Sequence, residues 1–486
     1  MRALVLVLAA LAAGPALAKS KKAPEPAPMV EAPAPPPDPL AERPAVGPAR
    51  PFAPPAPTVG QLSNGASTWT VVNDALPLFT VVLTVPGGSA LDPAGKEGTS
   101  ALAVECMQRG AGSRDAGAFA SEVERRGLSL SAGTGPDGAY AVLSGTTDQL
   151  DAGLDLLADM VMRPKFAGGE VKKAKELLLA GLQSSMDEPA YVANRTAQWL
   201  YWGAEHPYGR PSDGTLGGVK RAGRGDIKKW HKASWHPVGA RFTVVGAVDP
   251  AKVQAALEAR FGAAWKVGKR PAVVVPPAPA HDKEPIYLVD APGSSQTGFY
   301  LAFPGLPAGH AAAAPTRVGT IALGGTFTSR LNSLLREKRG YTYGVRAALD
   351  EMLHGGTLLV RTRIRADVTG AALVDLVGEL DGIRKGISAE ELGKAQGAFR
   401  QDIVESMETV SGTTMTFANL HEAGRAPDSL AADLGSVGSV SVDAVTQTMA
   451  PYDTSRAVIV LVGDIAKIKP QLEQAGFTKL SVVTPP

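Results

Sequence analysis

The chain has 486 residues, and its 49 Lys and Arg against 47 Asp and Glu give a formal net charge of +2. A balance this close to neutral gives no electrostatic reason to expect nucleic acid or an anionic membrane as a partner. The single cysteine, Cys106, excludes an internal disulfide framework and a zinc site built from cysteines.

Residues 1–18 have the features of a secretory signal peptide. Arg2 makes the start basic, residues 3–13 are apolar, and residues 16–18 (Ala-Leu-Ala) supply the small side chains of a cleavage site. Neither this run nor any later one reaches the roughly 18 consecutive apolar residues that span a bilayer, so we predict no transmembrane segment. We expect cleavage after Ala18 and a mature protein in the periplasm or outside a bacterial cell.

Residues 19–57 are predicted to form a disordered, Pro-rich linker. From Pro24 to Pro57, 14 of 34 residues are proline. Such a tract cannot build a hydrogen-bonded core and favours an extended polyproline conformation. We interpret it as a spacer, with a proline-dependent recognition motif as the alternative.

The remaining part of the chain, about 430 residues, is long enough for two domains and contains an internal repeat. Three segments of its first half recur in the same order in its second half. The pairs are residues 124–130 with 337–343, residues 170–187 with 391–408, and residues 241–253 with 456–468. We therefore predict a duplication.

Each half groups strands and helices in a way that favours the α+β class. In the first half, alternating or apolar runs predict strands, and 3.6-residue periodicity predicts helices. The strands are expected at residues 69–73, 78–85, 140–144 and 242–246, and the helices at 150–162 and 170–183. We predict two homologous two-layer α/β sandwich domains in tandem, at residues 58–268 and 284–480, joined by a Pro-rich linker at 269–283.

Several catalytic signatures are absent from the sequence, among them a Gly-x-Ser-x-Gly elbow and a phosphate loop. Residues 133–138 have the glycine spacing of a dinucleotide-binding loop. However, Pro136-Asp137-Gly138 is turn chemistry between two short strands, and it predicts a β-hairpin. The seven histidines include no helical pair flanking a carboxylate, so we expect no self-contained zinc site.

The most informative stretch is residues 329–345. Its leucines (331, 334 and 335) predict one face of a helix, Gly340 is expected to end that helix, and an alternating Tyr-x-Tyr-x-Val run predicts a strand from Tyr341. Arg336 precedes Tyr343 by seven residues, so a guanidinium and a phenol could point at the same place. Taken alone, the local pattern favours the alternative of an exposed helix arginine followed by a packed strand tyrosine.

Larger motifs resemble the insulinase/pitrilysin family of zinc metallopeptidases, over nearly the whole region that follows the Pro-rich linker. The order and spacing of six segments carry the resemblance. They are residues 89–98, 110–116, 206–209 and 246–250 in the first half, and residues 323–331 and 335–343 in the second.

The resemblance implies that the zinc site of the family is degenerate in this chain. Active members carry His-x-x-Glu-His on a helix and a glutamate on a later helix. The two histidine positions correspond to Ala101 and Glu105, the general-base position to Val104, and the later ligand to Gly181. None of these residues is the one required, so the chain alone is expected to bind no zinc and to cleave no peptide.

Arg336 and Tyr343 match the arginine and tyrosine with which the family contacts the scissile peptide or its oxyanion. The resemblance therefore implies an exported non-catalytic subunit that pairs with a zinc-bearing subunit and orients its peptide substrate. Two alternatives remain open: a purely structural family member in an envelope complex, and a solitary peptide-binding clamshell.

The run Val360–Arg365 alternates, which places Arg361, Arg363 and Arg365 on one face of a strand. These three arginines are weaker candidates for substrate binding. The alternation is equally consistent with a face that meets a peptide and with one that meets water.

Overall fold

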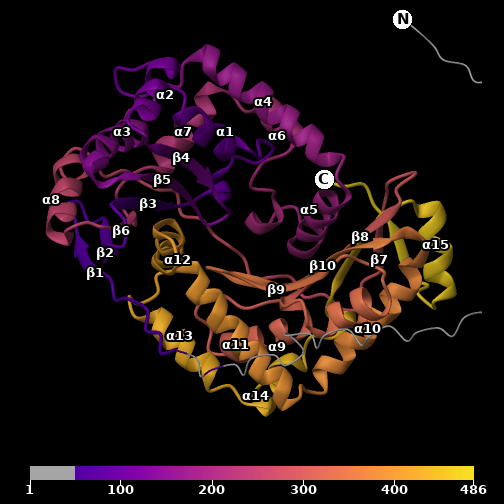
Figure 1. The fold of residues 1–486 in the computed structure, drawn as a ribbon. Coiled ribbons are helices and arrows are strands. Elements are labelled where there is room, and N and C mark those ends of the chain that lie inside the picture. Colours follow the sequence, from indigo (N-terminus) through magenta and orange to yellow (C-terminus); the bar gives the residue numbers. More distant parts are fainter. Residues whose placement is uncertain (1–46, 48–49) are drawn as a thin grey trace, which may run out of the picture. The chain divides into compact units, whose positions relative to one another are not determined.

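Two six-stranded sheets organise the fold in the computed structural model (Figure 1). The structure describes Gly47 and residues 50–486. The predicted signal peptide and most of the predicted Pro-rich linker therefore lie outside the described residues. Both sheets belong to one compact unit, residues 52–486.

The first sheet has the strand order β1-β2-β6-β3-β5-β4. Its strands are β1 (Thr58–Gln61), β2 (Ser67–Val72), β3 (Leu78–Pro86), β4 (Ser129–Thr134), β5 (Gly138–Thr146) and β6 (Arg241–Gly246). β4 and β5 form an antiparallel hairpin through residues 135–137, which confirms that the glycine-rich segment is a turn.

The second sheet has the strand order β12-β7-β11-β8-β10-β9. Its strands are β7 (Ile286–Asp290), β8 (Gln296–Pro304), β9 (Val345–Met352), β10 (Gly355–Arg365), β11 (Val458–Gly463) and β12 (Leu480–Val482). In each sheet one inner pair is parallel, β2 with β6 and β7 with β11, and β3 or β8 then runs antiparallel beside it. The sheets differ only in their outer strand: β1 is antiparallel to β2, whereas β12 is parallel to β7. This shared topology confirms the predicted duplication and the α+β class.

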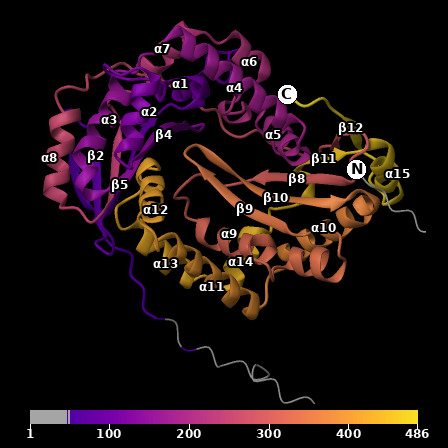
Figure 2. The ribbon, with the colours of Figure 1, turned by 45° about the horizontal axis from the view of Figure 1, so that its top comes forward.

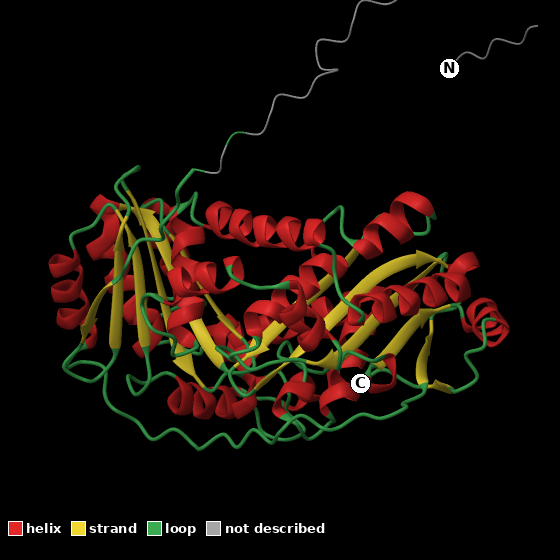
Figure 3. Ribbon diagram, turned by 90° about the horizontal axis from the view of Figure 1, so that it is seen from below, coloured by secondary structure: helices red, strands yellow, loops and turns green. Residues whose placement is uncertain are grey.

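Each sheet packs its own helices against one face. The helices of the first half are α1 (Thr99–Met107), α2 (Ala116–Arg125), α3 (Leu150–Met162), α4 (Gly168–Met186), α5 (Pro189–Trp202), α6 (Leu216–Arg221), α7 (Arg224–Ser234) and α8 (Pro250–Phe261). Those of the second half are α9 (Ala313–Thr320), α10 (Thr369–Arg384), α11 (Ala389–Ser406), α12 (Val410–Glu422), α13 (Ser429–Gly438), α14 (Val442–Met449) and α15 (Ile465–Gln474), together with the π-helices η4 (Ile321–Gly325) and η5 (Asn332–Lys338). Figure 3 shows the two groups of strands with helices alongside them.

The two halves exchange one helix each, which the sequence did not predict. Helix α5 of the first half packs on β8 and β11 of the second sheet, and α12 of the second half packs on β3 and β6 of the first (Figure 2). Each exchanged helix follows the long helix of its repeat, α4 or α11. The inner strands are consequently buried on both faces, as in residues 79–85 of β3. Within the described part of the chain, every helix is too short or too polar to cross a membrane.

Aromatic packing fixes α12 on the first sheet. Phe417 is fully buried there against Trp69, Val71 and Val245. His421, one turn further on, stacks on the Trp69 ring with centroids 4.2 Å apart. Its two ring nitrogens lie 2.7 Å from the hydroxyl of Ser67 and 3.1 Å from that of Thr243.

The exchange predicts that damage to α12 destabilises the N-terminal half. Four of the six tryptophans, Trp69, Trp230, Trp235 and Trp265, lie in the cores of the N-terminal half, so their fluorescence reports that half, whereas Trp199 and Trp202 lie on α5. Phe417→Ala should lower the free energy of unfolding, measured from the tryptophan fluorescence, by about 3–5 kcal/mol because it leaves a cavity in a buried core. The matched control Met415→Ala, at a 39% exposed position of α12, should have little effect. An unmoved tryptophan transition in Phe417→Ala would contradict the exchange.

A second prediction concerns acid stability. Burial, and secondarily Arg241, lowers the pKa of His421 from 6.5 to about 3. Below about pH 6.5 the His421 imidazole therefore binds a proton in the unfolded chain but not in the folded chain. The free energy of unfolding should consequently fall as pH decreases from 6.5 towards 3. His421→Gln should flatten this slope in denaturant titrations. Since His231 has a pKa lowered to about 4 by burial, some slope should remain. Parallel curves for the two proteins would contradict the assignment.

Candidate functional site

Arg336 lies in the π-helix η5, which is anchored by the fully buried Leu331 and Leu335. The helix ends at Lys338, and Gly340, two residues further on, has a left-handed φ of 62°, as expected for a glycine that follows a helix. Strand β9 begins only at Val345. The expectation of a strand from Tyr341 is therefore wrong: Tyr341 and Tyr343 lie in the segment that connects η5 to β9.

The Arg336 side chain is 30% exposed and rests on an aromatic ring. Its Cζ lies 3.5 Å from the centroid of Phe327, which is itself exposed, and its Nε lies 3.4 Å from the Glu337 carboxylate. At exposed sites a cation–π contact contributes only about 0.5–1 kcal/mol. The guanidinium is thus held loosely.

Tyr343 is the most exposed large side chain among the described apolar and aromatic residues, at 92%. It lines a cleft of about 710 Å³, which we call the Tyr343 cleft. Arg361 and Arg363 of β10 line the same cleft, and α5 supplies another wall through Tyr191 and Asn194. The structure therefore brings together Tyr343 and two of the three predicted strand arginines.

Thr362 explains why these residues meet. Its hydroxyl donates to the carbonyl of Gly344 at 2.8 Å and lies 2.9 Å from the hydroxyl of Thr342. The Gly344 N–H in turn donates to the Thr342 hydroxyl at 3.1 Å. Both neighbours of Tyr343 are thereby tied to the residue that stands between Arg361 and Arg363.

Asn332 fixes the same segment from the helix side. Its side-chain amide accepts a hydrogen bond from the Val345 N–H and donates one to the Val345 carbonyl, both at 2.8 Å. It also donates to the carbonyl of Thr326 at 2.9 Å. A buried side chain here takes the place of a strand partner, so Tyr343 stands free on a constrained backbone.

Along β10 the three arginines are exposed and the residues between them, Thr362 and Ile364, are buried, which confirms the predicted alternation. Arg363 forms a long ion pair of 3.8 Å with Glu188, and Arg365 forms a short one of 2.6 Å with Asp367. Arg365 is not part of the Tyr343 cleft. Arg336 is likewise absent from the described residues that line it.

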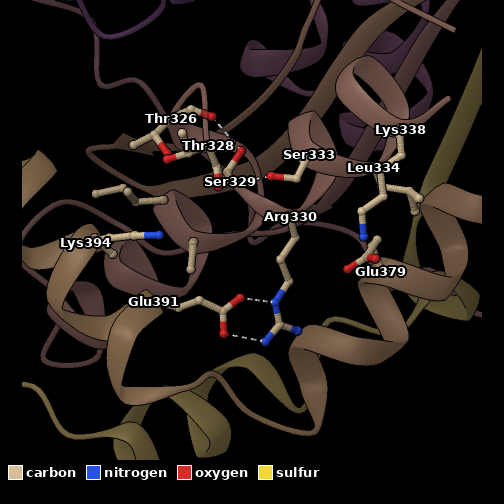
Figure 4. A pocket seen from close by; sticks show the side chains of 13 residues that line it. Thr326, Thr328, Ser329, Arg330, Ser333, Leu334, Lys338, Glu379, Glu391 and Lys394 are labelled. Atoms are coloured by element: carbon tan, nitrogen blue, oxygen red, sulfur yellow. Dashed lines mark hydrogen bonds and ion pairs between the residues drawn. The ribbon is translucent and has the colours of Figure 1, made fainter. Parts of the chain in front are cut away.

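A smaller pocket of about 280 Å³ is lined in part by Ser333, Leu334 and Lys338 of η5 (Figure 4). Arg330 crosses it and binds both carboxylate oxygens of Glu391, at 2.5 and 2.9 Å, and this contact holds the pKa of Glu391 down at about 2. Glu391 also accepts the Ser388 N–H in the capping box of α11. The Arg330–Glu391 ion pair thus fixes the N-terminal end of α11.

The degenerate zinc positions lie on two helices that pack together, with Ala101, Val104 and Glu105 on α1 and Gly181 on α4. Val104 is buried in the first core, and the Glu105 carboxylate accepts from Arg109 at 2.6 Å. Among the described residues, no group of three or more His, Cys, Asp and Glu is placed to hold a metal ion.

Two models of one family match this duplicated fold. Residues 71–200 match insulinase (peptidase family M16), and residues 221–399 match the peptidase M16 inactive domain. The chain belongs to the insulinase family, peptidase M16. The matched descriptions and the missing ligands together support a non-catalytic member.

Relatives and solved structures extend the likeness over most of the chain. An uncharacterized zinc protease of Mycobacterium tuberculosis is 26% identical over 374 residues, which cover 76% of this chain and 84% of that protein. The non-peptidase homolog YmxG of Helicobacter pylori is 23% identical over 329 residues, covering 67% and 74%. A peptidase M16 inactive domain from Pseudomonas fluorescens superposes with a TM-score of 0.77 at 24% identity, covering 84% of this chain and 97% of that one. A protease from Helicobacter pylori gives 0.79 at 18% identity, covering 85% and 100%.

The Asn332 contacts generate a stability prediction. Asn332→Ala leaves the N–H and carbonyl of Val345 and the Thr326 carbonyl without this partner, and an unpaired buried group costs about 1–3 kcal/mol. We expect at least that loss in the free energy of unfolding. The neighbouring Ser333→Ala is the control, because the Ser333 hydroxyl is exposed and makes only a 3.3 Å bond to Thr328. Equal effects of the two substitutions in denaturant titrations would contradict a stabilising role for the Asn332 hydrogen bonds.

Proposed function

We propose that this chain is the exported, zinc-less subunit of an insulinase-type metallopeptidase, which binds and orients peptide for a zinc-bearing partner subunit. One observation carries the proposal. The Tyr343 phenol stands 92% exposed on a backbone fixed by Asn332 and Thr362, inside a cleft that two arginines share. A free donor on a rigid support is the preorganisation that stabilises developing negative charge.

Tyr343 and Arg336 have distinct roles in this proposal. The phenol donates a single hydrogen bond to the peptide carbonyl or to the oxyanion that forms on it. Arg336 supplies a permanently charged fork. Because its contacts to Phe327 and Glu337 are solvent-exposed, they are weak enough for a peptide oxygen to displace them.

The zinc and the general base belong to the partner subunit in this account. Ala101, Val104 and Gly181 offer no ligand atoms, and Glu105 is engaged by Arg109. What this chain contributes is the opposite wall of the chamber. We place the assembly in the periplasm or outside the cell, on the strength of the N-terminal sequence.

The test uses the complex with the zinc-bearing subunit. Tyr343→Phe and Arg336→Ala should each lower kcat, with about 10²- to 10³-fold as the size of effect for one oxyanion donor, while assembly measured by size-exclusion chromatography is unchanged. Tyr341→Phe is the matched control, because Tyr341 lies in the same segment but packs against the second core. Unchanged turnover in both variants would favour a purely structural role.

A separate prediction addresses the cleft arginines. Reversing both charges, Arg361→Glu with Arg363→Glu, should weaken binding of an acidic peptide to the full mature chain at least tenfold by fluorescence polarisation, because attraction becomes repulsion. Arg365→Glu is the control, since Arg365 is outside the cleft and paired with Asp367. If the double reversal leaves affinity unchanged, this strand face meets only water.

A further inference from the structure

The Tyr343 cleft continues into two further hollows. The first, of about 720 Å³, runs along α5 and shares Tyr191 and Asn194 with the Tyr343 cleft. The second, of about 420 Å³, shares Pro136, Glu351 and Met352 with the first. Together they form one groove, with Tyr343, Arg361 and Arg363 at one end.

The other end of the groove, which we call the acidic pocket, collects three carboxylates. Asp137 comes from the β4–β5 turn, Glu351 from the end of β9, and Glu422 from the last turn of α12. Gly138 allows this approach, since any side chain there would collide with the Glu422 carboxylate. The larger apolar side chains of the lining are Val82, Pro136, Tyr140, Met352, Leu353 and Met415, and Asn419 adds an amide.

Two of these carboxylates form no ion pair with any residue that the structure describes. Asp137 accepts from the Tyr208 hydroxyl at 2.6 Å and from the Leu353 N–H at 3.2 Å, both of which are neutral donors. Among the described residues, no ion pair within 4.0 Å reaches Glu422, although Arg241 lies in its neighbourhood. Burial first, and Asp137 second, raise the pKa of Glu422. A cation in the pocket would relieve both effects.

A second, independent observation points to a ligand with hydrogen-bond donors. Thr84 of β3 lines the pocket, is only 4% exposed, and its hydroxyl has no hydrogen-bond partner. It stands on the same face of β3 as Thr80, whose hydroxyl contacts Ser411 of α12 at 3.2 Å. One oxygen of Glu351 is also buried and unpartnered, while the other accepts from Arg317 at 2.5 Å. Buried polar atoms are normally satisfied, so these two indicate an absent partner. An N–H donor satisfies both, because a carboxylate oxygen accepts and a hydroxyl can accept.

The residues that line the pocket favour a cationic side chain over a metal ion. No group of metal-ligating side chains is found among the described residues, and half of the lining is apolar. A lysine or arginine side chain matches this arrangement, with an apolar stem and a charged head that carries several N–H donors.

We propose that the acidic pocket binds the cationic side chain of a lysine or arginine in the bound peptide, with its N–H groups donating to Thr84, Glu351 and Glu422. This inference rests on the proposed peptide-binding function and adds a specificity site to it. The groove then carries negative charge at the acidic pocket and positive charge at the opposite end, where Arg361 and Arg363 attract acidic groups.

The test compares peptides that differ only in lysine or norleucine at one position, scanned along the sequence, on the full mature chain. At one position the lysine peptide should bind at least tenfold tighter. Glu422→Gln and Thr84→Val should each reduce this preference below about threefold without changing norleucine-peptide affinity. Glu176→Gln, on the exposed side of α4, is the control. Equal lysine and norleucine affinities at every position would overturn the acidic pocket and leave the proposed function standing.

A small probe tests the pocket without the rest of the groove. Millimolar N-butylguanidinium should raise the Tm of the wild-type chain above that in N-butylurea, its neutral counterpart, and Glu422→Gln should abolish the difference. Thr84→Val removes only an unpaired hydroxyl, so it should fold normally and also lose the shift. No shift in the wild-type chain would overturn the proposal whatever the peptides do.

Discussion

The exchange of α5 and α12 between the two halves is the constraint on which the rest of the structure depends. Each sheet has one face buried under its own helices and an inner part of the other face buried under a helix from the opposite repeat. The same two helices form walls of the groove: α5 borders the Tyr343 cleft and α12 borders the acidic pocket. Packing and the proposed binding surface therefore have a common origin.

At the degenerate zinc positions on α1, the side chains of Val104 and Glu105 are engaged in packing and ion pairing. Val104 fills core space where the family has a general base, and Glu105 is neutralised by Arg109 one helical turn away. The Tyr343 cleft differs. There the side chains of Asn332 and Thr362 form hydrogen bonds with the backbone that follows Tyr343, whose own side chain is 92% exposed. Such a support is hard to explain by stability alone, and this contrast favours a retained binding role.

Much of the fold could be predicted because its signals are local. Helix α3 has the predicted bounds and β3 differs by a single residue. Two of the three repeat pairs, residues 170–187 with 391–408 and 241–253 with 456–468, lie in equivalent strands and helices. The alternation of the β10 arginines followed from the two-residue period of a strand. The exchange could not be predicted, since the apolar face of α5 does not say which sheet it will cover. Likewise the Tyr341 segment has a strand pattern, but its Gly344 carbonyl and Thr342 hydroxyl bond to the side chain of Thr362. Thr84 and Glu422 meet only through α12, so no spacing in the sequence connects them.

We propose that this chain receives peptide but depends on another chain for its metal. The most direct measurement is purification of the native protein from its host with whatever accompanies it, followed by metal analysis of each separated chain. The account predicts one equivalent of zinc on a second, co-purifying chain that carries His-x-x-Glu-His, and none on this one. Stoichiometric zinc on this chain alone, or a peptidase activity of the lone chain that a chelator abolishes, would contradict it.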